Sequence, residues 1–115
     1  MSSERLFKNL PFGLSKDEVR DIIAVLNSYP AVERACIFGS RAKRTHKRGS
    51  DIDMALYGQN LDQFVTEISY QLNEESLLPY YFDVLDYSSI TNQDLRDHID
   101  RVGILFYQRP PLNHK

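Results

Sequence analysis

The sequence has little of several features that mark common protein classes. It contains one cysteine, Cys36, among 115 residues, which excludes a disulfide framework and a cysteine-rich zinc site. No run approaches the roughly 20 apolar residues that span a bilayer. The first residues show no basic segment followed by an apolar one. We therefore expect a soluble, cytoplasmic protein with no membrane contact.

The net charge is also small. Lys and Arg number 14 against 16 Asp and Glu, so the chain as a whole does not attract nucleic acid, and we expect no direct nucleic-acid binding. The charge is nevertheless uneven, because five of the basic residues fall between 41 and 48 in the run RAKRTHKR. An isolated run of this kind is usually a solvated loop, and its neighbours decide whether it does more.

Length and composition favour one folded domain. Hydrophobic residues make up 42% of the chain and aromatic residues 11%, which is enough for a packed core. The sequence shows no repeat, linker or low-complexity segment. We expect a single domain over residues 1–115, with a core at about 15–108 and a tail at 109–115.

Helices and strands alternate along the chain. Ser15 and Glu18 have the spacing of a capping box, and the apolar residues that follow recur on one helical face as far as Leu26. Further elements are expected as strand 33–38, strand 51–57, a helix capped by Asn60, strand 80–86, a helix capped by Thr91 and ended by Gly103, and strand 104–107. This order predicts an α+β fold with one mixed sheet of about four strands and helices mainly on one face.

Two acidic residues share one face of the second strand. Asp51 and Asp53 are two residues apart, and side chains alternate along a strand, so both carboxylates point the same way. They repel each other unless a cation lies between them, and carboxylate oxygens suit Mg²⁺ or Mn²⁺. Two ordinary exposed acids are the alternative that this pair alone leaves open.

The turn after the first strand suits a phosphate. Gly39 lets the backbone approach a ligand closely, and Ser40 can cap the next helical turn and donate to a phosphate oxygen. The segment is not a P-loop, and an ordinary turn with a serine cap is the plain alternative. On the third strand, Asp83 is an acid in an apolar setting. It either joins the same metal site or pairs with a basic residue.

Taken together, these residues resemble a known family. Gly39-Ser40, the basic stretch and Gly49-Ser50-Asp51-Ile52-Asp53 are similar to the signature of the DNA polymerase β-like nucleotidyltransferases, above all their minimal prokaryotic members. The segment 81–86 resembles the strand that carries the family's third carboxylate. The resemblance extends over about residues 15–108. Arg44 departs from it, because the family usually has a second glycine there.

The resemblance implies a polymerase β-type fold and a metal-dependent transfer of a nucleotide. Asp51, Asp53 and Asp83 would be catalytic and would hold two Mg²⁺ ions, with Mn²⁺ as an alternative. The substrate would be an NTP, with ATP expected. The nucleotide-binding residues would be Gly39, Ser40, Arg41, Lys43 and Ser50.

Small members of this family commonly form a toxin–antitoxin pair with a HEPN-domain protein. The resemblance therefore implies a hetero-oligomer in which the chain attaches AMP to a hydroxyl of the toxin. Two alternatives stay open: a binding antitoxin with weak or no catalysis, for which Arg44 is the argument, and a transferase that acts on a small molecule.

Overall fold

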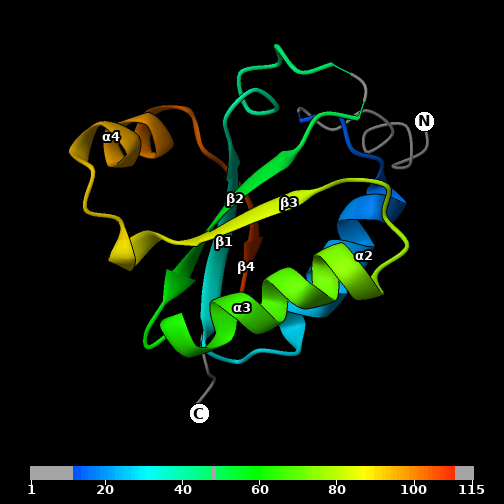
Figure 1. Ribbon diagram of the computed structural model, residues 1–115, viewed down its shortest axis with the longest axis horizontal. Coiled ribbons are helices and arrows are strands. Elements are labelled where there is room, and N and C mark those ends of the chain that lie inside the picture. The colour runs from blue at the N-terminus through cyan, green and yellow to red at the C-terminus, as the bar shows by residue number, and fades with distance from the viewer. Residues whose placement is uncertain (1–11, 48, 111–115) are drawn as a thin grey trace.

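The computed structural model describes residues 12–47 and 49–110. One mixed sheet of four strands forms the centre, with strand order β3-β2-β1-β4. Strands β2 and β3 are parallel, and the other two pairs are antiparallel. The expected α+β fold is therefore confirmed (Figure 1).

The elements in chain order are α2 (Lys16–Asn27), β1 (Val32–Phe38), β2 (Ile52–Gly58), α3 (Asp62–Tyr70), the π-helical turn η1 (Gln71–Glu75), β3 (Phe82–Asp86), the 3-10 turn η2 (Tyr87–Ser89), α4 (Gln93–Val102) and β4 (Ile104–Gln108).

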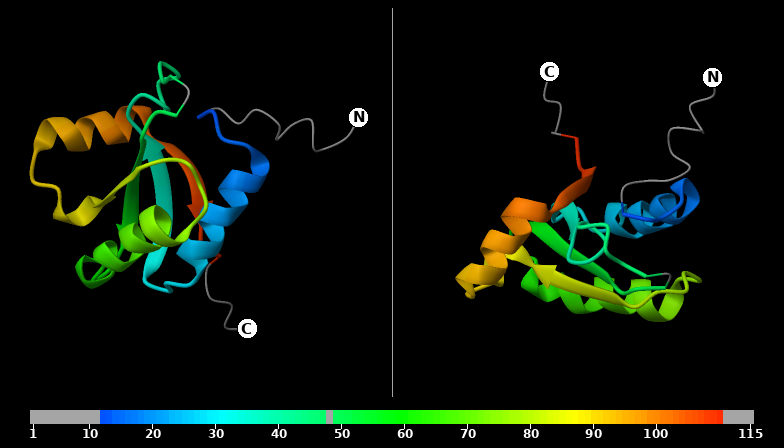
Figure 2. Two further views of the ribbon diagram at one scale, coloured as in Figure 1. Left: turned by 45° about the vertical axis from the view of Figure 1, so that its right-hand side comes forward. Right: turned by 90° about the horizontal axis from the view of Figure 1, so that it is seen from above.

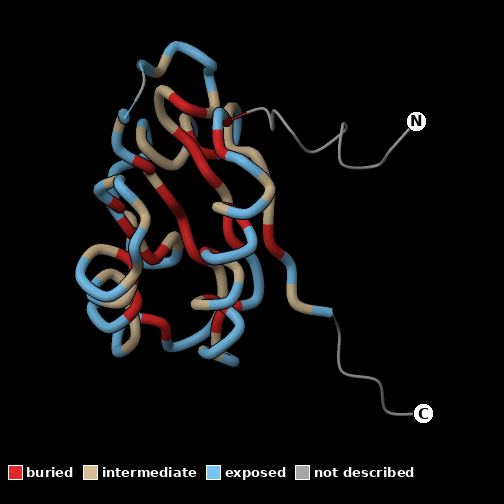
Figure 3. The backbone as a smooth tube through the Cα atoms, turned by 90° about the vertical axis from the view of Figure 1, so that its right-hand side faces the viewer, coloured by how far each residue is buried: buried red, intermediate tan, exposed pale blue. Residues whose placement is uncertain are grey.

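The main core lies between one face of the sheet and the helices α2 and α3. Alternate residues of β2, namely Ile52, Met54 and Leu56, are fully buried there against Ile22 of α2 and Ile68 of α3. This alternation is what a strand with one face on the core requires. Figure 3 shows the buried stretches running along the strands, and Figure 2 shows the helices around them.

The opposite face of the sheet is covered in part by α4. Phe38 and Ala55 pack there against Ile99 of α4 in a second, smaller cluster. The helices thus lie mainly, though not entirely, on the face away from the three acidic residues. No helix in the described part of the chain is long and apolar enough to cross a membrane.

A stack of side chains attaches α4 and η2 to this face. The rings of Tyr57 and Tyr87 stack with their centroids 4.7 Å apart. Arg34 lies 4.4 Å over the Tyr57 ring, and Arg96 lies 4.5 Å over the Tyr87 ring. Arg96 also donates to the backbone oxygens of Tyr87 and Ile90. The segment that leads into α4 is therefore held to the strands by cation–π contacts and hydrogen bonds.

Several local predictions are corrected. The α4 cap is Asn92, which accepts from the backbone of Leu95, and Thr91 is not the cap. Helix α3 begins after Leu61 with no side-chain cap, and Asn60, the expected cap, has a left-handed backbone at φ 58°. Asp86, the last residue of β3, is buried and caps η2 by accepting from Ser88.

The core extends beyond its predicted limits. Phe12 and Leu14 are buried ahead of residue 15. Arg109, assigned to the tail, donates to the backbone oxygens of Val32 and Tyr29 and so belongs to the folded part. The remaining tail, residues 111–115, lies outside the described residues, as do residues 1–11 and Arg48 of the basic run.

Candidate active site

Three carboxylates lie on the same face of two neighbouring strands. Asp53 and Asp83 are register partners in the parallel pair of β2 and β3, and Asp51 lies two residues before Asp53. Asp51 and Asp83 are exposed, whereas Asp53 is half-buried. Burial, followed by the charges of Asp83 and Asp51, raises the pKa of Asp53. The sheet therefore brings together the three acids that the sequence singled out.

Gly39 makes room for the Asp53 carboxylate. Its φ is 76°, in the left-handed region that glycine adopts easily. A Cβ atom at Gly39 would overlap Oδ2 of Asp53. Glycine is needed here for two reasons, because the backbone must turn sharply after β1 and because the carboxylate lies directly against it.

The segment after Gly39 folds as a hydrogen-bonded turn. The backbone N–H of Lys43 donates to the Gly39 oxygen at 3.1 Å, and that of Thr45 donates to the Ser40 oxygen at 2.9 Å. Ser40 is half-buried and Lys43 is exposed. The hydroxyl oxygen of Ser50 accepts from the backbone N–H of Lys47 at 2.9 Å, so Ser50 closes the loop just before Asp51.

The structure gives Arg41 a different position from the one expected of a nucleotide ligand. Arg41 is 2% exposed. It donates to the backbone oxygen of Phe12 at 2.9 Å and twice to that of Ser50, and it lies over the Tyr80 ring. Its N–H groups donate to backbone oxygens of the protein itself. Arg41 therefore holds the loop in place, although it was expected to contact phosphate.

Arg44, which stands where the family pattern usually has glycine, has a left-handed backbone conformation that glycine adopts easily. Its φ is 63°, which is uncommon for a residue with a side chain. Although arginine departs from the family pattern here, the backbone at this position is left-handed. The side chain of Arg44 is exposed, so it meets no steric obstacle to its presence in the loop.

The sequence analysis missed His98. This residue of α4 is half-buried, and its ring meets the edge of the Phe38 ring at 6.0 Å between centroids. Its charge acts on Asp53 and lowers the pKa of that carboxyl, against the larger effects that raise it. No local motif marks His98, because its proximity to Asp53 depends on how α4 packs on the sheet.

The chemistry of the carboxylates fits Mg²⁺. Acidic oxygens from two strands face one side, and Gly39 leaves the space that Asp53 occupies. Within residues 12–47 and 49–110, no three His, Cys, Asp or Glu side chains are arranged to hold a metal by themselves. Mg²⁺ commonly takes one or two carboxylates and completes its coordination with water and substrate phosphates, so the two observations are compatible.

Residues 20–111 match the family described as "Polymerase beta, Nucleotidyltransferase". The match covers most of the chain and includes all three acids as well as the Gly39 turn. The chain therefore belongs to the polymerase β-type nucleotidyltransferase family.

Named relatives have similar sequences or folds. A Haemophilus influenzae protein described as "Probable protein adenylyltransferase MntA" is 33% identical over 73 residues, which is 63% of each chain. The chain thus spans less than two thirds of that protein's length. A solved toxin–antitoxin structure with AMP-PNP has a TM-score of 0.66 at 24% identity, covering 79% of this chain and 73% of that one. A complex of tri-AMPylated Shewanella oneidensis HEPN toxin with MNT antitoxin has a TM-score of 0.62 at 23% identity, covering 82% and 72%. At these identities, the structural matches show the fold.

Proposed function

We propose that the chain transfers AMP from ATP, with Mg²⁺, to a hydroxyl group of a HEPN-domain partner protein in the cytoplasm, and so acts as an antitoxin. The observation that supports this most directly is the placement of Asp53. It lies between Asp51 and Asp83 on one sheet face and against Gly39. These are the residues to which the resemblance to the nucleotidyltransferases assigns metal and phosphate binding.

Each residue of the site has a proposed role. Asp51 and Asp53 hold Mg²⁺, with Mn²⁺ as a substitute, and Asp83 completes the set. Gly39 and Ser40 receive the terminal phosphates on the turn after β1, and Ser50 keeps that loop closed. The exposed ammonium of Lys43 offsets phosphate charge, whereas Arg41 acts by fixing the loop.

The transfer itself is an in-line displacement at the α-phosphorus. The acceptor oxygen bonds to phosphorus, the bond to the oxygen that bridges the α- and β-phosphates breaks, and pyrophosphate leaves. Asp83, exposed at the rim, accepts the proton of the acceptor hydroxyl. Bound Mg²⁺ supplies charge stabilisation for the attacking and leaving oxygens. The protein mainly positions the reacting groups.

The partner is inferred from similarity. The relative from H. influenzae is described as a protein adenylyltransferase, and the S. oneidensis complex holds an AMPylated HEPN toxin. A tyrosine hydroxyl is the expected acceptor. The chain would then work in a hetero-oligomer, since its partner brings the acceptor to the open carboxylate face.

The test uses a HEPN-domain protein as the partner, and the product of the gene next to this one is the first candidate. Purified protein and partner are incubated with ATP labelled on the α-phosphate, with Mg²⁺ or with EDTA. We expect label on the partner in the presence of Mg²⁺ and none in the presence of EDTA. The Asp53→Asn variant should transfer no label under either condition. The same variant should lose metal-dependent ATP binding in calorimetry while keeping its fold. Equal MgATP affinity in the variant and the parent would contradict the assignment.

The same assay separates the alternatives. A binding antitoxin would form a complex with the partner and leave it unlabelled. A small-molecule transferase would neither bind nor label it. The left-handed backbone of Arg44 favours the active form over the binding antitoxin, because the loop conformation does not depend on glycine there.

A further inference from the structure

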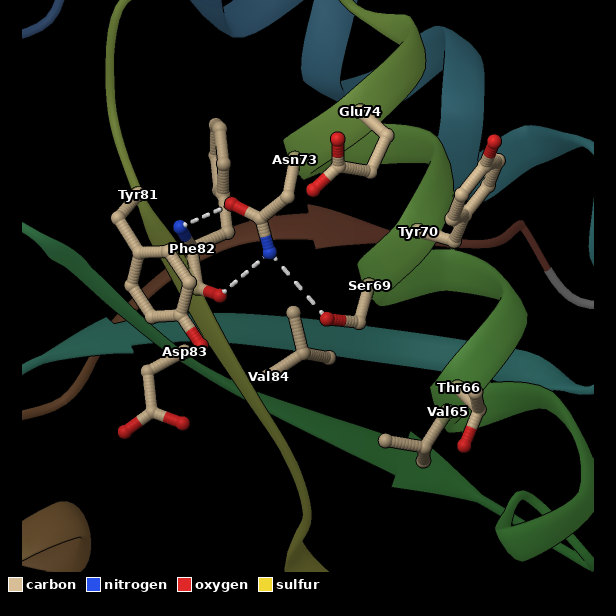
Figure 4. Close-up of a pocket in the computed structure, with 10 residues that line it drawn as sticks. All are labelled: Val65, Thr66, Ser69, Tyr70, Asn73, Glu74, Tyr81, Phe82, Asp83 and Val84. Carbon is tan, nitrogen blue, oxygen red and sulfur yellow. Dashed lines mark hydrogen bonds between the residues drawn. The ribbon is translucent and has the colours of Figure 1, made fainter.

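A groove of about 410 Å³ lies beside Asp83, on the outer side of β3. Helix α3 and η1 form one wall, and residues 81–84 form the other (Figure 4). Two exposed aromatic rings line it, since Tyr70 is 56% exposed and Tyr81 is 58% exposed. The volume is within the range of ligand pockets. Because Asp83 lines the groove and also belongs to the candidate active site, the two are continuous.

The outer edge of β3 is open for backbone pairing in this groove. Strand β3 is at the end of the sheet, and the Tyr81 oxygen accepts from Ile52 on the β2 side. The Asn73 carboxamide pairs with both the N–H and the oxygen of Phe82 from the other side, at 2.7 and 2.9 Å. Backbone groups two residues apart in a strand point the same way, so those of Val84 face outward into the groove.

The charge of the groove favours one kind of bound segment. Both of its charged lining residues, Glu74 and Asp83, are acidic. A segment with basic side chains complements this charge. An open strand edge binds an extended peptide by strand addition, in which main-chain hydrogen bonds give affinity and pockets beside the edge accept alternate side chains. Exposed aromatic rings at the wall add apolar contact area.

We propose that the groove binds an extended, basic segment of the acceptor protein, which adds to the edge of β3 and brings its hydroxyl to Asp83. This inference rests on the proposed function, since it names how the acceptor of that reaction is held. Asn73 occupies the edge at Phe82, so the added segment pairs at Val84 and beyond. On the other side of Phe82 the segment leaves the strand edge and contacts Tyr70 and Tyr81.

The experiment compares groove variants for two constants, the KM for the HEPN-domain partner in AMP transfer and the Kd for MgATP. Tyr81→Ser should raise the KM about tenfold, as for loss of an aromatic anchor, and leave the Kd within about twofold. Leu105→Ser is the matched control, because Leu105 is 48% exposed on the opposite edge strand β4. It should change neither constant.

Two substitutions of opposite charge at one position test whether the bound segment is basic. Thr66 lines the groove and is exposed on α3. Thr66→Lys should raise the KM for the partner and Thr66→Glu should lower it, while both keep the Kd for MgATP. Hydrogen exchange provides a second measurement: the Val84 amide should exchange more slowly when the partner binds, and the β4 edge should not change.

The outcomes separate this inference from the proposed function. If the parent protein leaves the partner unlabelled, the proposed function fails, and the exchange of Val84 alone decides the groove. If labelling occurs but all variants keep the parental KM, the groove inference fails by itself. Weaker MgATP binding with an unchanged KM would place the nucleotide in the groove and overturn the inference. Unchanged exchange at Val84 on mixing with the partner would also overturn it.

Discussion

At the scale of the residue, the site depends on one close approach of a backbone to a carboxylate. Gly39 lies where a side chain would occupy the place of the Asp53 carboxylate. Gly49 has nearly the same backbone conformation, with φ 78° against 76°, but a Cβ atom there would meet nothing within 4 Å. A substitution at Gly49 therefore costs backbone strain alone, whereas a substitution at Gly39 costs backbone strain and also displaces Asp53.

Gly39→Ala should lose AMP transfer, whereas Gly49→Ala should keep most of it. Both variants should lose about 1 to 2 kcal/mol of unfolding free energy from the left-handed backbone, with a larger loss at Gly39. Urea unfolding and the labelling assay measure the two effects. Equal activity of the two variants would show that Asp53 is not held in place by the gap at Gly39.

A second residue-scale prediction concerns Asp53 and pH. Burial and the charges of Asp83 and Asp51 raise its pKa. A carboxyl with a raised pKa in the folded state adds stability below its ordinary pKa, and this contribution is lost as the pH rises through the raised pKa. The ionised Asp53 therefore destabilises the metal-free protein at neutral pH.

Asp53→Asn should raise the melting temperature in EDTA by a few degrees at pH 7. The gain should shrink as the pH falls toward the ordinary range for aspartate, because the parental carboxyl is then protonated. Thermal unfolding between pH 4 and pH 8 measures this difference. A variant that is less stable than the parent at pH 7 in EDTA would contradict the repulsion.

At the scale of the element, α4 brings His98 against Phe38 of β1, next to the candidate site. The helix packs on the sheet through the small cluster around Ile99. Its approach is fixed by Arg96, which bonds the backbone of η2 and covers the Tyr87 ring. The position of His98 beside Asp53 thus depends on contacts at the far end of the same face.

Arg96→Met should cost about 1 to 2 kcal/mol, since it removes a cation–π contact and hydrogen bonds from a charged donor. It should also speed hydrogen exchange in α4. The control is Arg101→Met, an exposed position in the last turn of the same helix, with an expected cost below about 1 kcal/mol from the helix dipole alone. Similar losses of unfolding free energy in the two variants would show that Arg96 does not anchor α4.

At the scale of the whole molecule, Arg41 connects three segments that are distant in the sequence. It binds the backbone at Phe12 and at Ser50, and its guanidinium lies 4.9 Å from the centroid of the Tyr80 ring. The Tyr80 hydroxyl donates to Glu18 at 2.8 Å, and Glu18 is part of the α2 capping box. The loop that follows Gly39 is therefore attached to helix α2 through Arg41 and Tyr80.

Arg41→Met should destabilise the protein by about 2 to 4 kcal/mol, because it leaves buried backbone oxygens without donors. Lys43→Met, two residues away and exposed, should change stability by less than about 0.5 kcal/mol and weaken MgATP binding instead. Urea unfolding and calorimetry distinguish the two. If Arg41→Met kept full stability, its buried contacts would not hold the loop.

Much of the fold follows from local patterns in the sequence. The Ser15–Glu18 capping box, the helical spacing after it and the two-residue alternation in β2 are short-range properties, and each is present as predicted. The cap at Asn92 was missed because neighbouring polar residues compete for one cap position, and the start of α3 was missed because no side chain caps it. Alternation also placed Asp51 and Asp53 on one face before any packing was known.

The sequence by itself thus determined the order of the elements and the shared direction of the strand acids, because these depend on neighbours along the chain. Only the tertiary structure decided which basic residue is buried, where the groove beside Asp83 lies and that His98 packs against Phe38 next to the site. Arg41 and Lys43 look alike in a basic run. They differ because contacts from Phe12 and Tyr80 surround one of them, and such long-range packing leaves no local signal.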